Sequence, residues 1–149
     1  MSRISIHKLR ECKDSGKRFA MLTAYDYPTA RLVEQAGIPV ILVGDSLGTT
    51  VLGYESTVPV TMEEMLHHTR AVVRATKKSI VVADMPFLSY QPSKRDALHN
   101  AGRFIKAGMK DIKIEKGADE SVSLFGPRLI DTEDGCPVGL GATQKGYGC

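Results

Sequence analysis

The sequence predicts an α/β fold in which helices alternate with parallel strands, arranged as a (β/α) barrel or part of one. Three short apolar runs, at residues 40–45, 80–84 and 112–115, have the length and the β-branched composition of buried parallel strands, and each ends on a carboxylate. Helical patterns separate these runs along the chain. Since no GxGxxG motif follows the first expected strand, at residues 19–25, a dinucleotide-binding fold is disfavoured.

The length and composition of the chain limit the classes of protein to which it can belong. The 149 residues suffice for one domain with a core, and 42% apolar and 25% charged residues are ordinary globular values. The net charge of +3 comes from scattered basic residues, so we do not expect nucleic-acid binding. No apolar run is long enough to span a membrane and no signal-peptide core is present, which predicts a cytoplasmic protein. Cys12, Cys136 and Cys149 are widely spaced and are expected to be reduced thiols.

Capping signals set the expected helix boundaries. Ser5 is placed to cap a first helix, Pro28 falls in the first turn of a second, and Thr61 followed by Glu64 forms a capping-box pattern. Ser93 is placed to cap a further helix. The expected elements are a helix over residues 5–16, strand 19–25, helix 27–37, strand 38–43, a helix opened at residue 61, strand 80–83, helix 93–108 and strand 112–115.

Two segments lack a regular pattern. Residues 44–59 form a long glycine-containing loop after an expected strand, and long loops in compact domains are often functional. In the tail, residues 121–129 have some helical character, but Gly126-Pro127 interrupts them, and an interior proline costs a helix roughly 3 kcal/mol. Pro137-Val138 is a candidate start for a fifth strand.

Asp45, Asp84 and Glu115 end three different expected strands. Ligands of α/β folds gather at the carboxyl ends of parallel strands, and carboxylate oxygens suit a hard cation. Taken singly, Asp45 has the alternative role of a turn residue, and Asp84 that of a partner for a helix dipole. Together, the three acids favour a cation site, with Ser46 as a hydrogen-bond donor to a substrate.

Lys113 and Glu115 are two positions apart on one expected strand, so their side chains share a face. A buried Lys–Glu pair is costly unless it is paired or functional, which favours a role in a barrel lumen. The alternative is an ion pair on a frayed edge strand. His67 and His68 point in different directions on their helix, and we expect them, with His7 and His99, to face solvent.

Several of these segments together resemble the ketopantoate hydroxymethyltransferases. The similarity extends over roughly the first 117 residues in order and spacing, and a series of this kind is far more specific than any single motif. The matching stretches are Thr-Ala-Tyr-Asp at 23–26, Leu-Val-Gly-Asp-Ser-Leu-Gly at 42–48, Thr-Val-Pro-Val-Thr at 57–61, Val-Ala-Asp-Met-Pro-Phe at 82–87 and Lys-Ile-Glu at 113–115.

The resemblance implies a (β/α)8 TIM-type barrel of which this chain holds about the first four or five β/α units. Residues 1–117 would be the barrel portion and residues 118–149 a shortened, degenerate continuation. The implied reaction is Mg²⁺-dependent transfer of a hydroxymethyl group from 5,10-methylenetetrahydrofolate to the keto acid α-ketoisovalerate, in pantothenate biosynthesis. The resemblance also implies a homo-oligomer, a decamer in the family. The composition, by contrast, is the reason that we expect no nucleic-acid or membrane partner.

The resemblance also assigns roles to single residues. Asp45 and Asp84 would hold Mg²⁺ and contact the substrate, Glu115 would be a nearby metal ligand, often through water, and Ser46 and Lys113 would bind the keto acid. The general-base glutamate of the family would lie beyond Cys149, so no catalytic base is assigned. Residues 137–144 lack the histidine of the family's Gly-His-x-Gly-Leu motif. We therefore expect little turnover from this chain alone, because losing a general base typically costs about 10²–10⁴-fold.

Two other hypotheses remain open. The chain is, alternatively, an inactive truncated product that associates with other chains through its exposed strand edges. The second alternative is another Mg²⁺-dependent enzyme acting on α-keto acids, of the phosphoenolpyruvate mutase and isocitrate lyase type. The cysteine loop of that group has no counterpart between Lys113 and Cys149, which disfavours this hypothesis.

Overall fold

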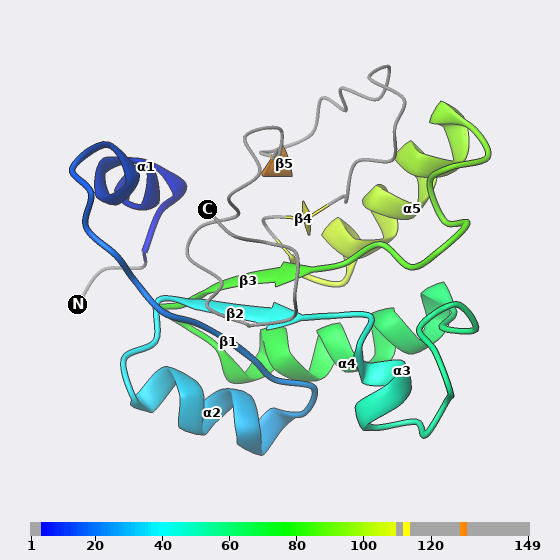
Figure 1. Cartoon of the computed structure of the whole chain (residues 1–149), viewed down its shortest axis with the longest axis horizontal. Helices are drawn as coiled ribbons and strands as arrows, with labels where there is room; N and C mark the ends of the chain where they lie inside the picture. The colour runs from blue at the N-terminus through cyan, green and yellow to red at the C-terminus, as the bar shows by residue number, and fades with distance from the viewer. Residues whose placement is uncertain (1–3, 110–111, 114–128, 131–149) are drawn as a thin grey trace.

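A three-stranded parallel sheet in the order β1-β2-β3 forms the centre of the molecule (Figure 1). The computed structural model describes residues 4–109, 112–113 and 129–130. Its strands alternate with helices, which confirms the predicted α/β class. The elements are α1 (Ile6–Asp14), β1 (Met21–Thr23), α2 (Tyr27–Gln35), β2 (Val40–Val43), α3 (Leu47–Thr50), α4 (Met62–Ala75), β3 (Ile80–Ala83), α5 (Lys94–Lys106), β4 (Ile112–Lys113) and β5 (Leu129–Ile130).

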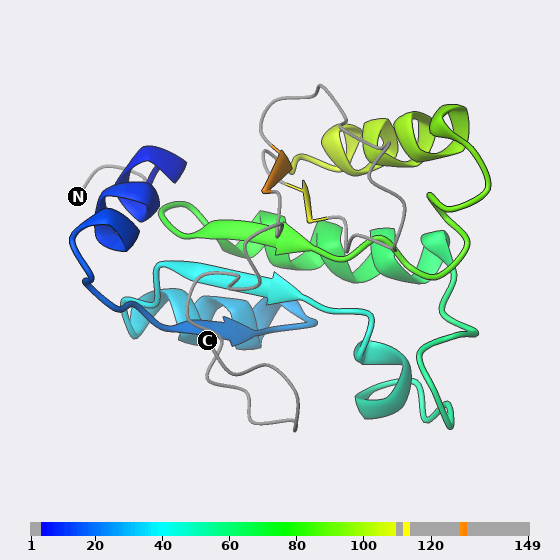
Figure 2. The ribbon, with the colours of Figure 1, turned by 45° about the horizontal axis from the view of Figure 1, so that its top comes forward.

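The register of the sheet brings the carboxyl ends of its strands to one edge. Thr23 of β1 pairs with Leu42 of β2, which in turn pairs with Val82 of β3. The residues that follow each strand therefore emerge side by side. The short helix α3 lies beyond this edge and α1 beyond the opposite, amino-terminal ends of the strands (Figures 1 and 2).

The two faces of the sheet are buried in different clusters, as expected for strands that are apolar on both sides. Helices α2 and α4 cover one face of the sheet (Figure 2). Ile41 and Val81 belong to the cluster on this face, together with Phe104 from α5. Leu42 and Val82, one position further along each strand, belong to the cluster on the other face, which Leu9 of α1 joins. This alternation follows from the two-residue period of a strand.

Most predicted helix starts are confirmed. Ser5 caps α1, and Ser93 caps α5. Thr61 and Glu64 form the complete capping box at the start of α4, each side chain accepting a hydrogen bond from the other residue's backbone N–H. Asp26, which the sequence analysis did not single out, caps α2 by accepting from the N–H of Thr29 at 2.8 Å.

The segments without a regular pattern were predicted less well. The loop at 44–59 contains the short helix α3, and β1 is shorter than the expected strand 19–25. Leu129–Ile130 forms β5, which pairs in parallel with β4, whereas residue 129 was considered as a helix end. The candidate fifth strand at Pro137-Val138 and the expected boundary near residue 117 lie outside the described residues.

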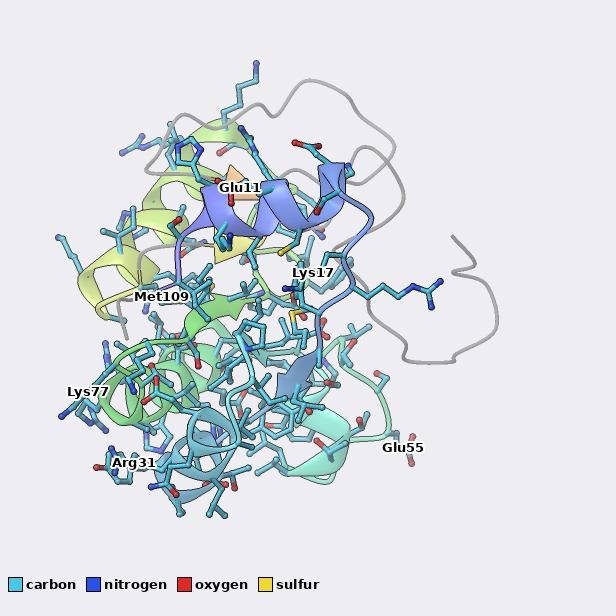
Figure 3. The ribbon with its side chains drawn as sticks, turned by 90° about the vertical axis from the view of Figure 1, so that its left-hand side faces the viewer. Glu11, Lys17, Arg31, Glu55, Lys77 and Met109 are labelled. Atoms are coloured by element: carbon cyan, nitrogen blue, oxygen red, sulfur yellow. The ribbon has the colours of Figure 1, made fainter. Side chains whose placement is uncertain are left out.

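Glu34 ties α2 to the turn between α4 and β3. Its Oε1 atom accepts hydrogen bonds from the backbone N–H groups of Lys77, Lys78 and Ser79, at 2.7, 2.7 and 3.1 Å. Figure 3 shows Lys77 near the end of α4, on the same side of the molecule as Arg31 of α2. Burial raises the pKa of Glu34, but the three N–H groups together outweigh it and leave the pKa below its ordinary value.

The remaining structural expectations concern exposure and membranes. Within the described part of the chain, no helix has the length and apolar character required to cross a membrane. Cys12 is a free thiol, as expected, while Cys136 and Cys149 lie outside the described residues. His7 and His99 are exposed, also as expected.

Candidate active site

Asp45 and Asp84, the predicted cation ligands from β2 and β3, lie together at the carboxyl edge of the sheet. The backbone N–H of Asp45 donates a hydrogen bond to Oδ2 of Asp84 at 3.3 Å. The N–H of Asp84 in turn donates to the carbonyl oxygen of Val43 at 3.0 Å, which continues the ladder one residue past the strand. Asp84 is only 8% exposed, so its carboxyl group is held in a largely buried position at the strand end.

Ser46 lies next to Asp45 and contacts a residue that the sequence analysis did not assign to the site. Its Oγ atom is 2.8 Å from the phenolic oxygen of Tyr25, and the two hydroxyls share a hydrogen bond. Tyr25 follows β1 as Asp45 follows β2. The signal for its involvement was its position after a strand, in the Thr-Ala-Tyr-Asp stretch, but a tyrosine there is equally compatible with packing.

Gly44 permits the close approach of these groups. A Cβ atom at this position would lie 2.9 Å from Oγ of Ser46 and 3.4 Å from Oδ2 of Asp84. The first distance is shorter than real Cβ contacts, so a larger residue at position 44 would displace the serine side chain. The glycine therefore leaves space between two of the predicted ligand-binding oxygens.

His68 holds Tyr25 from the side of α4. Its Nδ1 atom lies 2.6 Å from the carbonyl oxygen of Tyr25, and because a carbonyl only accepts, Nδ1 carries the hydrogen. His68 is half-buried, so the expectation that it faces solvent was wrong; its neighbour His67 is exposed as expected. The error arose because a contact over 43 residues leaves no local pattern.

A second set of contacts joins the long loop to α4. Tyr54 donates its hydroxyl hydrogen to Oε1 of Glu64 at 2.5 Å, and Oε2 of the same carboxyl accepts from Thr61. The bond from Tyr54, followed by those from Thr61, holds the pKa of Glu64 below its ordinary value, and the same bond raises the pKa of Tyr54. The capping carboxyl of α4 thus also anchors the loop that carries Ser46.

Lys113 and Glu115 are the other two predicted site residues. Lys113 lies on β4, where it pairs in register with Ile130. Glu115 falls outside the described residues, so its place beside Lys113 on one strand face stays a prediction. β4 lies beside β3 and pairs with β5 in a separate two-stranded sheet.

The donor set suits a small hard cation. The two carboxylates of Asp45 and Asp84 are oxygen ligands, and Mg²⁺ is typically bound through one or two carboxylates while it keeps several waters. Across residues 4–109, with 112–113 and 129–130, there is no cluster of three His, Cys, Asp or Glu side chains that would make a complete protein cage. Asp45 and Asp84 therefore fit as part of a Mg²⁺ site that water or further ligands would complete.

Solved structures of other proteins share the fold of this chain. The chain is similar to phosphoenolpyruvate phosphomutase from Streptomyces platensis, with a TM-score of 0.60 at 24% identity over 74% of this chain and 38% of that one. A phosphonopyruvate hydrolase in complex with oxalate and Mg²⁺ gives a TM-score of 0.59 at 17% identity, over 83% and 44%. At these identities the likeness shows the fold alone, and it agrees with the expected part of a (β/α) barrel.

Sequence comparison identifies the family. Residues 3–130 match the family model described as ketopantoate hydroxymethyltransferase. A 3-methyl-2-oxobutanoate hydroxymethyltransferase from Carboxydothermus hydrogenoformans is 61% identical over 120 residues, which are 80% of this chain and 44% of the relative. The chain belongs to the ketopantoate hydroxymethyltransferase family, and it spans less than half the length of this curated relative.

Proposed function

We propose that the chain carries the keto-acid and Mg²⁺ binding portion of a 3-methyl-2-oxobutanoate hydroxymethyltransferase. The reaction is transfer of a hydroxymethyl group from 5,10-methylenetetrahydrofolate to 3-methyl-2-oxobutanoate, which is the keto acid named α-ketoisovalerate above. One observation carries the proposal: Asp45, Ser46 and Asp84 meet at the carboxyl edge of a parallel sheet, where barrel enzymes bind their ligands. Membership of the ketopantoate hydroxymethyltransferase family supports the same function.

Each residue has a distinct role in this proposal. Asp45 and Asp84 would hold Mg²⁺, which when bound acts as a Lewis acid toward the oxygens of the keto acid. Ser46 would donate a hydrogen bond to the ligand. Lys113 would neutralise negative charge on it, and Glu115 would bind the cation directly or through water.

The choice of cation and ligand class rests on chemistry. The described oxygens suit Mg²⁺ better than a soft metal. The phosphonopyruvate hydrolase of the same fold was solved with Mg²⁺ and oxalate, whose two adjacent carboxylates resemble the adjacent keto and carboxylate groups of an α-keto acid. The proposal further includes the folate co-substrate, a role in pantothenate biosynthesis, a cytoplasmic location and a homo-oligomeric assembly.

Titration calorimetry tests the proposal by measuring how the chain binds the keto acid, because binding is the step to which the described residues would contribute. The chain is titrated with 3-methyl-2-oxobutanoate in the presence of Mg²⁺ and again with EDTA. We expect binding only with Mg²⁺. Asp84→Asn should weaken it by at least roughly 100-fold, because changes to residues outside the ligand shell already cost 10–100-fold.

A matched control separates the loss of a ligand from the loss of a charge. Asp96 is an exposed acid in the first turn of α5, and Asp96→Asn should leave binding unchanged. Binding without Mg²⁺, or equal binding by Asp84→Asn, would contradict the proposed site. If the chain binds no keto acid but self-associates in sedimentation experiments, this would instead favour the alternative of an inactive product that associates through its exposed strand edges.

A further inference from the structure

Tyr25 and Ser46 form a hydrogen bond between the ends of two neighbouring strands. The two oxygens are 2.8 Å apart, the pair is partly buried, and either hydroxyl can be the donor. The geometry alone therefore leaves the direction of this bond open. The ligand chemistry of the site decides it.

Tyr25 is held firmly on both sides of its Cα atom. The N–H of the preceding residue, Ala24, donates to the carbonyl of Leu42 at 3.0 Å, so the chain is paired with β2 up to this point. The carbonyl of Tyr25 accepts from Nδ1 of His68 at 2.6 Å, and its ring packs against the main core cluster. A phenol fixed in this way presents its hydroxyl at a defined position.

Ser46 is unusual for a serine at the start of a helix. It occupies the N-cap position of α3, yet its side chain makes no capping hydrogen bond. N-cap serines ordinarily accept from the first N–H groups of their helix. Oγ of Ser46 is turned instead toward Tyr25 and Gly44, in the space beside Asp84.

The direction of the bond follows from the proposed function, on which this inference rests. A keto acid carries a carboxylate and a carbonyl, which only accept hydrogen bonds. A serine hydroxyl has one hydrogen and two lone pairs. If Ser46 donated its hydrogen to Tyr25, it would present only lone pairs to an anionic ligand; if Tyr25 donates, the serine hydrogen is available to that ligand.

We infer that Tyr25 is a positioning residue, which donates its phenolic hydrogen to Ser46 and thereby directs the serine hydrogen to an oxygen of the bound α-keto acid. Tyr25 does not touch the ligand in this arrangement. Two hydroxyls in series also polarise one another, so the bond from Ser46 to the ligand is strengthened. The contribution of Tyr25 to binding therefore passes through Ser46.

A double-mutant cycle measured by calorimetry tests this dependence. The variants Tyr25→Phe, Ser46→Ala and the double variant are titrated with 3-methyl-2-oxobutanoate in the presence of Mg²⁺. We expect Tyr25→Phe to raise the Kd roughly 3- to 10-fold, the range of a single hydrogen bond. In the Ser46→Ala background, the same change should alter the Kd by less than twofold, because the serine through which it acts is absent.

Tyr27→Phe is the matched control, since Tyr27 is an exposed tyrosine two residues away on α2. It should leave the Kd unchanged, and thermal melting of Tyr25→Phe checks that the fold is retained. Equal binding by Tyr25→Phe and wild type, or additive effects of the two site changes, would overturn this inference while the proposed function stands. Absence of Mg²⁺-dependent binding by the wild-type chain would overturn both.

Discussion

The backbone N–H of Asp45 donates a hydrogen bond to the side chain of Asp84, so one candidate cation ligand fixes the main chain of the other. This link crosses from the end of β2 to the end of β3, 39 residues along the chain. Because it uses a backbone donor, replacing the side chain of Asp45 leaves it in place. Changes at Asp84 therefore act on the positions of both residues, whereas changes at Asp45 act mainly on charge.

Gly44 is the position where we expect the smallest addition to disturb the site. In Gly44→Ala, the new methyl group would lie 2.9 Å from Oγ of Ser46, so the serine must move. Because the contacted atom is the end of a rotatable side chain, we expect the free energy of unfolding to fall by no more than about 1 kcal/mol, the value of one hydrogen bond, and the keto acid to bind roughly 10-fold more weakly. Urea unfolding and calorimetry measure the two effects.

Gly102→Ala provides the control for this change. Gly102 lies inside α5, and a Cβ there meets no atom within 4 Å. Alanine is the better helix former, so the free energy of unfolding of this variant should rise by up to about 1 kcal/mol. Its binding of the keto acid should equal that of the wild type. If Gly44→Ala behaved like Gly102→Ala in both measurements, the close approach at position 44 would have no energetic consequence.

Leu88, in the turn after Asp84, has a φ of 62°, a left-handed conformation that is costly for a branched side chain. Its side chain is 60% exposed, so little burial is lost on replacement. Asparagine tolerates this conformation, and we expect Leu88→Asn to raise the free energy of unfolding by about 0.5–1 kcal/mol. Leu98→Asn on α5, where the backbone is helical, should lower it by about 0.5 kcal/mol. Chemical denaturation that gives the same sign for both variants would contradict strain at Leu88.

Glu34 should make stability depend on pH. Its pKa in the folded state lies below the ordinary value of 4.5, because three backbone N–H groups outweigh the effect of burial. For a lowered pKa, the stabilisation is fully present above the ordinary value and is lost as the pH falls through the folded-state value. At pH 7, Glu34→Gln should therefore lower the free energy of unfolding by about 1 kcal/mol. This is a small value for hydrogen bonds to a charged acceptor, because the carboxylate is partly exposed to water.

The difference between Glu34→Gln and wild type should shrink as the pH is lowered below 4.5, as followed by thermal melting. Glu55→Gln is the control, because Glu55 is exposed in the loop before α4 (Figure 3). It should leave the pH profile unchanged. A constant difference between Glu34→Gln and wild type from pH 7 to pH 3 would show that the charge of Glu34 does not stabilise the turn.

Features with a local pattern were predicted well. The apolar runs at 40–43 and 80–83 became β2 and β3, and Ser5, Thr61 and Ser93 cap the helices they were expected to cap. Strand formation depends on the two-residue period of side chains, and helix capping depends on hydrogen bonds between residues three positions apart. Both features are determined by residues that are close together in the sequence.

Contacts between distant segments were not predictable in the same way. The sequence by itself determined the family, the parallel α/β arrangement, and the places of Asp45 and Asp84 at strand ends, because each depends on short runs of residues. Only the tertiary structure decided that Tyr25 meets Ser46, that His68 holds Tyr25, and that the N–H of Asp45 reaches Asp84. These pairs are separated by 21, 43 and 39 residues, so they form only after the register of the strands and the packing of α4 bring their backbones together.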